Sequence, residues 1–201
     1  MERKGVLLVF SGPSGAGKGT VCKELKQNNI AFRLSISATT RPPRSGEVDG
    51  VHYYFLKKDI FKEMIEDDQL LEWAEVYGNY YGTPRRFVQE ELDQGNDVIL
   101  EIDIQGALQV KEKFPEAVLI FIAPPSKSEL ELRLISRRTD SWEEIQKRLG
   151  CTIGEMKLAS RYDYIVINDE VMRAVEKVLA ILTAERSRPQ YFKSFFAQFM
   201  Q

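Results

Sequence analysis

The chain has 201 residues, 43% of them hydrophobic and 29% charged, and a formal net charge of −2 at pH 7. This length suits a single α/β domain with a sizeable core, and the composition excludes an intrinsically disordered protein. The slight acidic excess excludes a strongly basic nucleic-acid surface, and no apolar run has the length of a membrane span. We therefore expect a cytoplasmic protein without a nucleic-acid or membrane partner. A single histidine gives no His-based metal site, and we interpret both cysteines, Cys22 and Cys151, as reduced packing residues.

The first predicted strand, Val6–Ser11, is followed directly by a glycine-rich loop and a helical stretch. Glycines allow consecutive backbone N–H groups to converge on a phosphate, and the helix adds its positive N-terminal end. Lys18 supplies a mobile ammonium group that can follow a phosphate during its transfer. The order of strand, loop and helix therefore predicts a P-loop that binds a nucleoside polyphosphate. Its residues are Gly12, Pro13, Ser14, Gly15, Ala16, Gly17, Lys18, Gly19 and Thr20.

The other predicted strands are short apolar runs separated by helical patterns. Continuous apolarity is typical of parallel strands whose two faces are both covered by helices. The pattern predicts an α/β fold, in which a doubly wound parallel sheet has helices on both faces and binds its ligand at the carboxyl ends of the strands. The further strands are Val98–Asp103, Val118–Ile122 and Tyr164–Asn168, with a weaker one at Phe32–Ser37.

Two segments interrupt this alternation of strands and helices. Residues 39–94 are rich in Gly, Pro, Tyr and Arg, which predicts a small α+β insertion. Residues 125–143 carry three arginines beside the predicted phosphate site, which favours a mobile lid over a solvated helix face. These arginines are Arg133, Arg137 and Arg138. The remaining residues form the core of a single domain and comprise about 1–38, 95–124 and 144–201.

The predicted insertion collects side chains suited to a phosphorylated purine. Arg41 and Arg44 lie three residues apart in a loop stiffened by proline, and arginine is suited to two-pronged contacts with phosphate. Glu72 offers a carboxylate, which pairs well with a base that presents adjacent N–H groups. Guanine presents its N1–H and N2–H₂ groups together whereas adenine does not, so Glu72 indicates guanine.

Five motifs along the chain fit one known family. They are Ser14-Gly15-Ala16-Gly17-Lys18, Ser37-x-x-Thr40-Arg41-x-Pro43-Arg44-x-Gly46-Glu47, Glu72-Trp73, Asn79-Tyr80-Tyr81-Gly82 and Glu101-Ile102-Asp103-x-Gln105-Gly106. In this order they closely resemble the guanylate kinase family, whose members use ATP to phosphorylate GMP to GDP. The resemblance covers residues 6–184 and implies that 39–94 is a GMP-binding subdomain and 125–143 a lid. It implies ATP and GMP as substrates, and we expect dGMP to be accepted as well.

The resemblance also implies roles for single residues. Beyond the P-loop, the implied ATP site includes Arg133, Arg137 and Asn168. The implied GMP site comprises Ser37, Arg41, Arg44, Glu47, Tyr53, Glu72, Tyr81, Thr83 and Asp103. In that site, guanine is read by Ser37, Glu72 and Thr83, and the GMP phosphate is held by Arg41, Arg44, Tyr53 and Tyr81. The implied catalytic residues are Lys18, Arg41, Arg137 and Arg148.

Three residues depart from the family pattern. Gly19 stands where the strict P-loop motif has Ser or Thr to hold magnesium. We therefore expect Mg²⁺ to be held mainly by the ATP phosphates and water, with no ligand directly from the protein. Arg138 stands where a lid glycine is common, and Glu101 stands where some members have aspartate.

The sequence leaves other readings open. A guanylate-kinase-like interaction module without catalysis is one alternative, but such modules typically lack the P-loop lysine that Lys18 supplies here. A kinase acting on a phosphorylated sugar is another, although it has no use for Glu72 and Ser37. The aromatic tail at 187–201 fits either a terminal helix packed on the domain or a contact between copies in a homo-oligomer.

Overall fold

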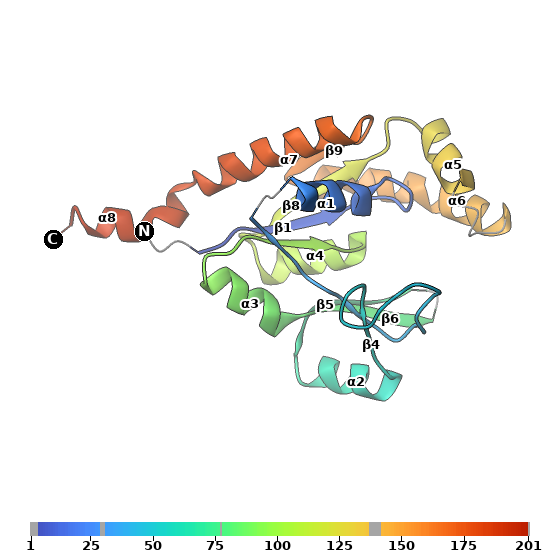
Figure 1. Ribbon diagram of the computed structural model, residues 1–201, viewed down its shortest axis with the longest axis horizontal. Coiled ribbons are helices and arrows are strands. Elements are labelled where there is room, and N and C mark those ends of the chain that lie inside the picture. Colours follow the sequence, from blue (N-terminus) through green and yellow to red (C-terminus); the bar gives the residue numbers. More distant parts are fainter. Residues whose placement is uncertain (1–3, 29–30, 77, 137–141, 201) are drawn as a thin grey trace.

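The computed structural model describes residues 4–28, 31–76, 78–136 and 142–200 (Figure 1). Its centre is a five-stranded parallel sheet with the strand order β2-β7-β1-β8-β9. Strand β1 is central because it pairs with β7 on one side and with β8 on the other. The strands are β1 (Leu7–Ser11), β2 (Arg33–Leu34), β7 (Val98–Glu101), β8 (Val118–Ala123) and β9 (Tyr164–Ile167).

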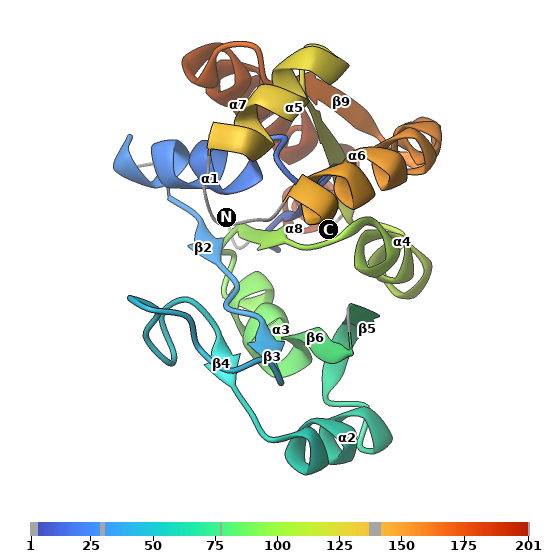
Figure 2. The same ribbon diagram turned by 90° about the vertical axis from the view of Figure 1, so that its right-hand side faces the viewer.

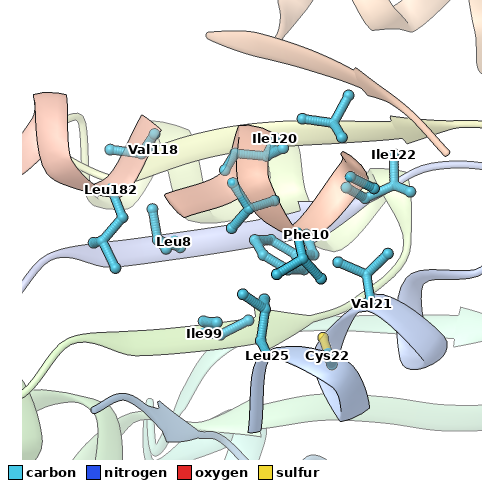
Figure 3. Packing of buried hydrophobic residues seen from close by; sticks show 14 of the residues in the cluster. Leu8, Phe10, Val21, Cys22, Leu25, Ile99, Val118, Ile120, Ile122 and Leu182 are labelled. Carbon is cyan, nitrogen blue, oxygen red and sulfur yellow. The ribbon is translucent and has the colours of Figure 1, made fainter. Parts of the chain in front are cut away.

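Helices cover both faces of this sheet, as the continuous apolarity of its strands predicts. One face packs against α1 (Lys18–Gln27) and α7 (Val171–Arg186), and Figure 3 shows Phe10, Val21 and Leu182 in that layer. The other face packs against α3 (Arg85–Asp93) and α4 (Ile104–Lys113). The predicted α/β fold, with a parallel sheet between two layers of helices, is confirmed.

Two predicted strands are clearly shorter in the structure, and the bounds of the other three differ by a single residue. The run Val98–Asp103 leaves the sheet after Glu101, because Asp103 caps α4 and its Oδ1 accepts a hydrogen bond from the Gly106 N–H at 2.9 Å. The weak strand at Phe32–Ser37 is reduced to β2. The Ser37 carbonyl instead accepts a hydrogen bond from the Tyr54 N–H at 2.9 Å, which belongs to a different sheet.

This second sheet lies below the first in Figure 2 and is built from residues between β2 and β7. Helix α2 (Lys58–Glu66) packs against it through Phe61, which stacks on Tyr80 with a ring-centre distance of 5.6 Å. Ala38, Phe61 and Leu70 form a small buried core of its own. The strand order is β4-β3-β6-β5, with β3 (Ala38–Thr39), β4 (Tyr54–Phe55), β5 (Leu70–Val76) and β6 (Asn79–Pro84).

Helices α5 (Lys127–Ser136) and α6 (Trp142–Lys157) follow β8 and pack against each other. The contact is apolar and involves Leu130, Leu134, Ile145 and Leu149. Helix α6 continues into the short helix η1 (Leu158–Arg161) and then into β9. Cys151 is exposed on α6, so its interpretation as a packing residue is wrong, whereas Cys22 is buried in α1 as predicted.

The chain ends in two short helices, η2 (Pro189–Phe192) and α8 (Lys193–Ala197), which extend beyond α7 (Figure 1). Tyr191 is buried against the core, but Phe196 and Phe199 are exposed. Phe195 contacts both rings edge-on, at centre distances of 5.6 and 5.0 Å. Within the described parts of the chain, no helix combines the length and the apolarity needed to cross a bilayer.

Candidate active site

The P-loop turns between the last residue of β1, Ser11, and the first residue of α1. Gly12 and Gly17 have φ angles of 138° and 90°, at which an L side chain is strained. A Cβ on Gly12 would also overlap the Ile122 carbonyl, and one on Gly17 would overlap the Asn168 amide. Among the described residues, no side chain caps the start of α1, so its first N–H groups can serve an anion.

The Lys18 side chain folds back over the first residues of the P-loop. Its Nζ donates to the carbonyl of Gly12 at 2.7 Å and to that of Pro13 at 3.1 Å. These bonds place the ammonium group over the cradle formed by the loop. A phosphate in that cradle therefore lies within a side-chain rotation of Lys18.

Two arginines reach the P-loop from helices α5 and α6. Arg148 Nη1 donates to Ser14 Oγ at 2.9 Å. Arg133 Nη1 donates to the Ala16 carbonyl at 3.4 Å, and its Nη2 donates to the Asn168 carbonyl at 3.0 Å. Three arginines, Arg133, Arg137 and Arg148, are predicted to bind the ATP phosphates or the transferred group, and the structure thus brings two of them to the loop. The third, Arg137, lies outside the described residues, as does Arg138.

Asn168 supports the loop from the neighbouring strand. It directly follows β9, is 2% exposed, and donates from Nδ2 to the Ala16 carbonyl at 2.8 Å. Its backbone N–H continues the sheet by donating to the Ala123 carbonyl at 2.8 Å. The side chain therefore fixes the P-loop backbone, and its predicted position near the ATP base stays a prediction.

Arg41 is held by Glu47 and by aromatic rings of the second sheet. Its Nη1 and Nη2 donate to the two carboxylate oxygens of Glu47 at 2.7 and 2.9 Å, the two-pronged geometry that also suits a phosphate. The guanidinium carbon lies 5.4 Å from the ring centre of Tyr53 and 5.6 Å from that of Phe55. Tyr81 meets Tyr53 edge-on at a centre distance of 6.1 Å. Arg41, Tyr53 and Tyr81 are thus brought together.

Glu47 orders the loop that carries the two predicted phosphate-binding arginines. Besides its bonds to Arg41, it accepts a hydrogen bond from the Arg44 N–H at 2.6 Å. These bonds, with the Arg41 contact as the largest cause, lower the pKa of Glu47 to about 2. The carboxylate is therefore ionised at neutral pH. The Arg44 side chain is exposed.

Glu72 of β5 and Thr83 of β6 form a buried pair in the second sheet, next to α4. Glu72 is 3% exposed, and its Oε1 accepts a hydrogen bond from Thr83 Oγ1 at 2.7 Å. Burial raises the pKa of Glu72 to about 7; the charge of Asp103 adds to this shift, and the hydrogen bond from Thr83 opposes it. A Cβ on Gly106 of α4 would overlap the carboxylate, so this close approach requires glycine. Two of the three predicted guanine-reading residues, Glu72 and Thr83, thus form one buried pair, and the predicted GMP-site residue Asp103 lies near it.

Glu101 connects the P-loop side of the site with the second sheet. Its Oε1 lies 3.3 Å from the place where a Cβ on Gly19 would stand. Burial raises the pKa of Tyr53, and the charge of Glu101 is the next cause. Glu101 therefore has the first turn of α1 on one side and the tyrosine of the second sheet on the other.

One carboxylate near the site, Glu155 on α6, is not among the site residues predicted from the sequence. Burial raises its pKa; the charge of Lys18 opposes that shift, and the charge of Asp103 adds to it. The available signal in the sequence is spacing, because Glu155 lies seven residues after Arg148 and so on the same face of one helix. Among residues 4–28, 31–76, 78–136 and 142–200, no group of three or more His, Cys, Asp or Glu side chains is arranged to hold a metal ion.

Comparison with known proteins gives consistent matches along nearly the whole chain. The sequence profile of the family Guanylate kinase matches residues 4–185. A guanylate kinase of Caldanaerobacter subterraneus subsp. tengcongensis is 57% identical over 196 residues, which cover 98% of this chain and 95% of that protein. A guanylate kinase of Desulfitobacterium hafniense is 56% identical over 187 residues, which cover 93% of this chain and 94% of that protein.

A solved structure also matches. The crystal structure of guanylate kinase from Anaplasma phagocytophilum superposes with a TM-score of 0.79 at 34% sequence identity. The match covers 94% of this chain and 90% of that one.

Proposed function

This chain belongs to the guanylate kinase family and is an ATP-dependent kinase that phosphorylates GMP to GDP, and from this premise we propose which of its residues bind each nucleotide. The proposal rests mainly on the buried Glu72–Thr83 pair, which belongs to the second sheet and contacts α4, the helix that follows β7. The relatives do not favour a non-catalytic interaction module or a sugar-phosphate kinase. Lys18, which such modules typically lack, is in place.

The P-loop, Gly12 to Thr20, binds the ATP phosphates. Its backbone supplies N–H donors, and Lys18 follows the transferred phosphoryl group. Arg133 and Arg148 bind phosphate oxygens from the side of α5 and α6, which is supported by their contacts with Ala16 and Ser14. Arg137 is assigned to the same phosphate site because the family resemblance implies it. Asn168 holds the loop in shape and borders the ATP base.

The second sheet binds GMP. Its phosphate contacts Arg41, Arg44, Tyr53 and Tyr81, and Glu47 holds the first two in place until the phosphate arrives. The guanine N1–H and N2–H₂ groups donate to the Glu72 carboxylate, and Thr83 fixes that carboxylate by its hydrogen bond. Ser37 and Asp103 complete the base site from the two connections that join the second sheet to the core.

Phosphoryl transfer in this site needs positioning and charge neutralisation more than covalent chemistry. An oxygen of the GMP phosphate attacks the γ-phosphorus of ATP in line with the departing ADP oxygen. The attacking oxygen is already anionic, so no enzyme nucleophile or strong base is needed. Lys18, Arg137 and Arg148 stabilise the charge on the transferring group, and Arg41 holds the acceptor in line.

Mg²⁺ is the cofactor that accompanies ATP, and Glu101 fits a hydrated Mg²⁺. Its carboxylate stands within 3.3 Å of the position that a side chain on Gly19 would take, where the strict P-loop motif has a hydroxyl group. Mg²⁺ keeps several waters in proteins and is held by one or two carboxylates together with substrate phosphates. Glu101 would therefore hold the ion through water. When bound, Mg²⁺ neutralises phosphate charge.

Three further proposals concern organisation. Residues 39–94 act as a GMP-binding subdomain and residues 125–143 as a lid, both moving on the core formed by 1–38, 95–124 and 144–201. The aromatic tail provides a contact between copies, because Phe196 and Phe199 are 50% and 74% exposed. Sedimentation of the Phe199→Ser variant tests this contact, and an unchanged oligomeric state would contradict it. The protein acts in the cytoplasm, without nucleic-acid or membrane partners.

A coupled assay for ADP release tests the substrate assignment. We expect turnover with GMP and dGMP, and little with AMP or ribose 5-phosphate, because only guanine offers adjacent donors to Glu72. Equal turnover with AMP and GMP would contradict the role of Glu72 in base selection.

A further inference from the structure

Glu155 is a carboxylate in a place where a kinase mostly presents positive charge. It is half-buried on α6, and no hydrogen bond or ion pair of its carboxylate occurs among the described residues. Two turns earlier on the same helix face, Arg148 reaches Ser14 of the P-loop. Helix α6 therefore carries Arg148 and Glu155 on the face that reaches the P-loop.

Two charged groups act on the Glu155 carboxylate from different parts of the site. Its charged neighbours are Lys18 at the P-loop and Asp103 at the start of α4, and both ribbon views show α6 passing above α4 (Figures 1 and 2). Burial raises the pKa of Tyr162, just after η1, to about 12, and the charges of Asp103 and Glu155 add to this shift. Lys18 marks the transferred phosphate, and Asp103 lies beside the guanine-reading Glu72. On this face of α6, Glu155 therefore lies near both the proposed phosphate site at Lys18 and the proposed base site at Asp103.

Chemistry restricts what this carboxylate can contact. A phosphate beside it would be repelled, because both groups are anionic. The part of a nucleoside monophosphate that lies between base and phosphate and offers uncharged donors is the sugar. Carboxylates accept hydrogen bonds from ribose hydroxyls in dinucleotide-binding folds, so the pairing has a sound chemical basis.

We propose that Glu155 binds the ribose hydroxyls of the acceptor nucleotide and makes the enzyme sensitive to the sugar. The proposal rests on the assignment of GMP to the second sheet and adds a sugar contact from α6 to it. Its carboxylate oxygens accept the hydrogen bonds, so that helix α6 contacts the bound acceptor nucleotide directly. Removing either the ribose hydroxyl groups or the Glu155 carboxylate then removes the same contribution to affinity.

The test compares Glu155→Gln with the parent enzyme on GMP and on 2′,3′-dideoxy-GMP, which lacks both hydroxyls. A hydrogen bond to a charged group is worth on the order of 1.5–3 kcal/mol, or roughly ten- to a hundred-fold in affinity. Because the Gln amide oxygen still accepts one hydrogen bond, we expect Glu155→Gln to weaken GMP binding by about ten-fold, the lower end of that range, measured by calorimetry and by kcat/KM, and to leave dideoxy-GMP within about two-fold. Glu176→Gln, the same change at an exposed carboxylate of α7, should leave both substrates unchanged.

Two results would overturn the proposal. One is an equal loss with both nucleotides, which would place Glu155 in general support of the site. The other is no loss with either nucleotide. In both cases the parent enzyme still phosphorylates GMP, so its assigned function stands; failure of the parent with GMP would instead refute that function. Unfolding midpoints of the variants confirm that the comparison is made between folded proteins.

Discussion

The Glu72 carboxylate lies directly against the α-carbon of Gly106, so that any side chain at position 106 would overlap it. Glu72 belongs to β5 of the second sheet, and Gly106 belongs to the first turn of α4 in the core. This contact is where the predicted base-reading residue meets the main domain. The room available at Gly106 therefore sets the position of the carboxylate that we propose reads guanine.

Gly106→Ala should weaken GMP binding indirectly, through a displacement of Glu72. The added methyl group displaces Glu72, so we expect the KM for GMP to rise about ten-fold or more while the KM for ATP stays within about two-fold. Unfolding stability should change by no more than about 1 kcal/mol, because alanine favours the helix. Gly150→Ala is the matched control, since a Cβ at that helical glycine meets no atom within 4 Å. Equal effects of the two substitutions would contradict the prediction.

Glu72→Gln should reduce the use of GMP selectively. The amide keeps the size of the side chain but replaces an acceptor with a group that also donates, so a guanine N–H group loses its partner. The loss should be on the order of 1.5–3 kcal/mol, or about ten- to a hundred-fold in kcat/KM for GMP. Calorimetric titration with ATP should give an affinity close to that of the parent. Equal weakening of both nucleotides would assign Glu72 to the scaffold.

The stability of the free enzyme should depend on pH through Glu72. Its pKa of about 7 in the folded state lies above the ordinary value of 4.5, so the folded state binds more protons between these pH values. The contribution is fully present below pH 4.5 and is lost as pH rises through 7. Relative to Glu72→Gln, the parent should lose on the order of 2–3 kcal/mol of unfolding free energy between pH 5 and pH 8. The unfolding free energy of each protein is measured by denaturant titration at both pH values. An equal change from pH 5 to pH 8 in the two proteins would contradict the prediction.

Lys18→Met should remove transfer while the fold persists. The ammonium interacts most strongly with the charge of the transferring group, so its loss should lower kcat by about a hundred-fold or more. The variant also loses the bonds to Gly12 and Pro13, which confines the structural effect to the loop. Circular dichroism checks the fold. Near-normal turnover would show that the P-loop assignment is wrong.

GMP should bring the second sheet toward the core. Its phosphate binds Arg41 on one side of the site and meets Lys18 and the transferred group on the other, so it favours the closed form. Labels at Lys23→Cys on α1 and Lys62→Cys on α2, in a Cys151→Ser background, report the distance. Both labelled positions are exposed. We expect shortening with GMP and less with ATP alone, and an unchanged distance at saturating GMP would refute closure.

The sequence predicts best those features that depend on local order. The P-loop follows from its glycines and Lys18, and the covered parallel sheet follows from continuous apolar runs. The end of β7 could not be read in this way, because Asp103 continues the polar and apolar pattern of the strand yet caps α4. Composition does not reveal that Glu47 holds Arg41, nor that Asn168 supports the loop from β9. Those contacts depend on how distant elements come together.

The pairing of β2 with β7 has a consequence for how this chain folds. Arg33 stands opposite Val98, although the whole second sheet lies between them in the chain. Pairings of such high sequence separation form slowly, because a long loop must close before they gain contacts. The small core around Phe61 shortens that loop once it has formed. Loss of Phe61 should therefore slow refolding of the central sheet as well as loosen the second one.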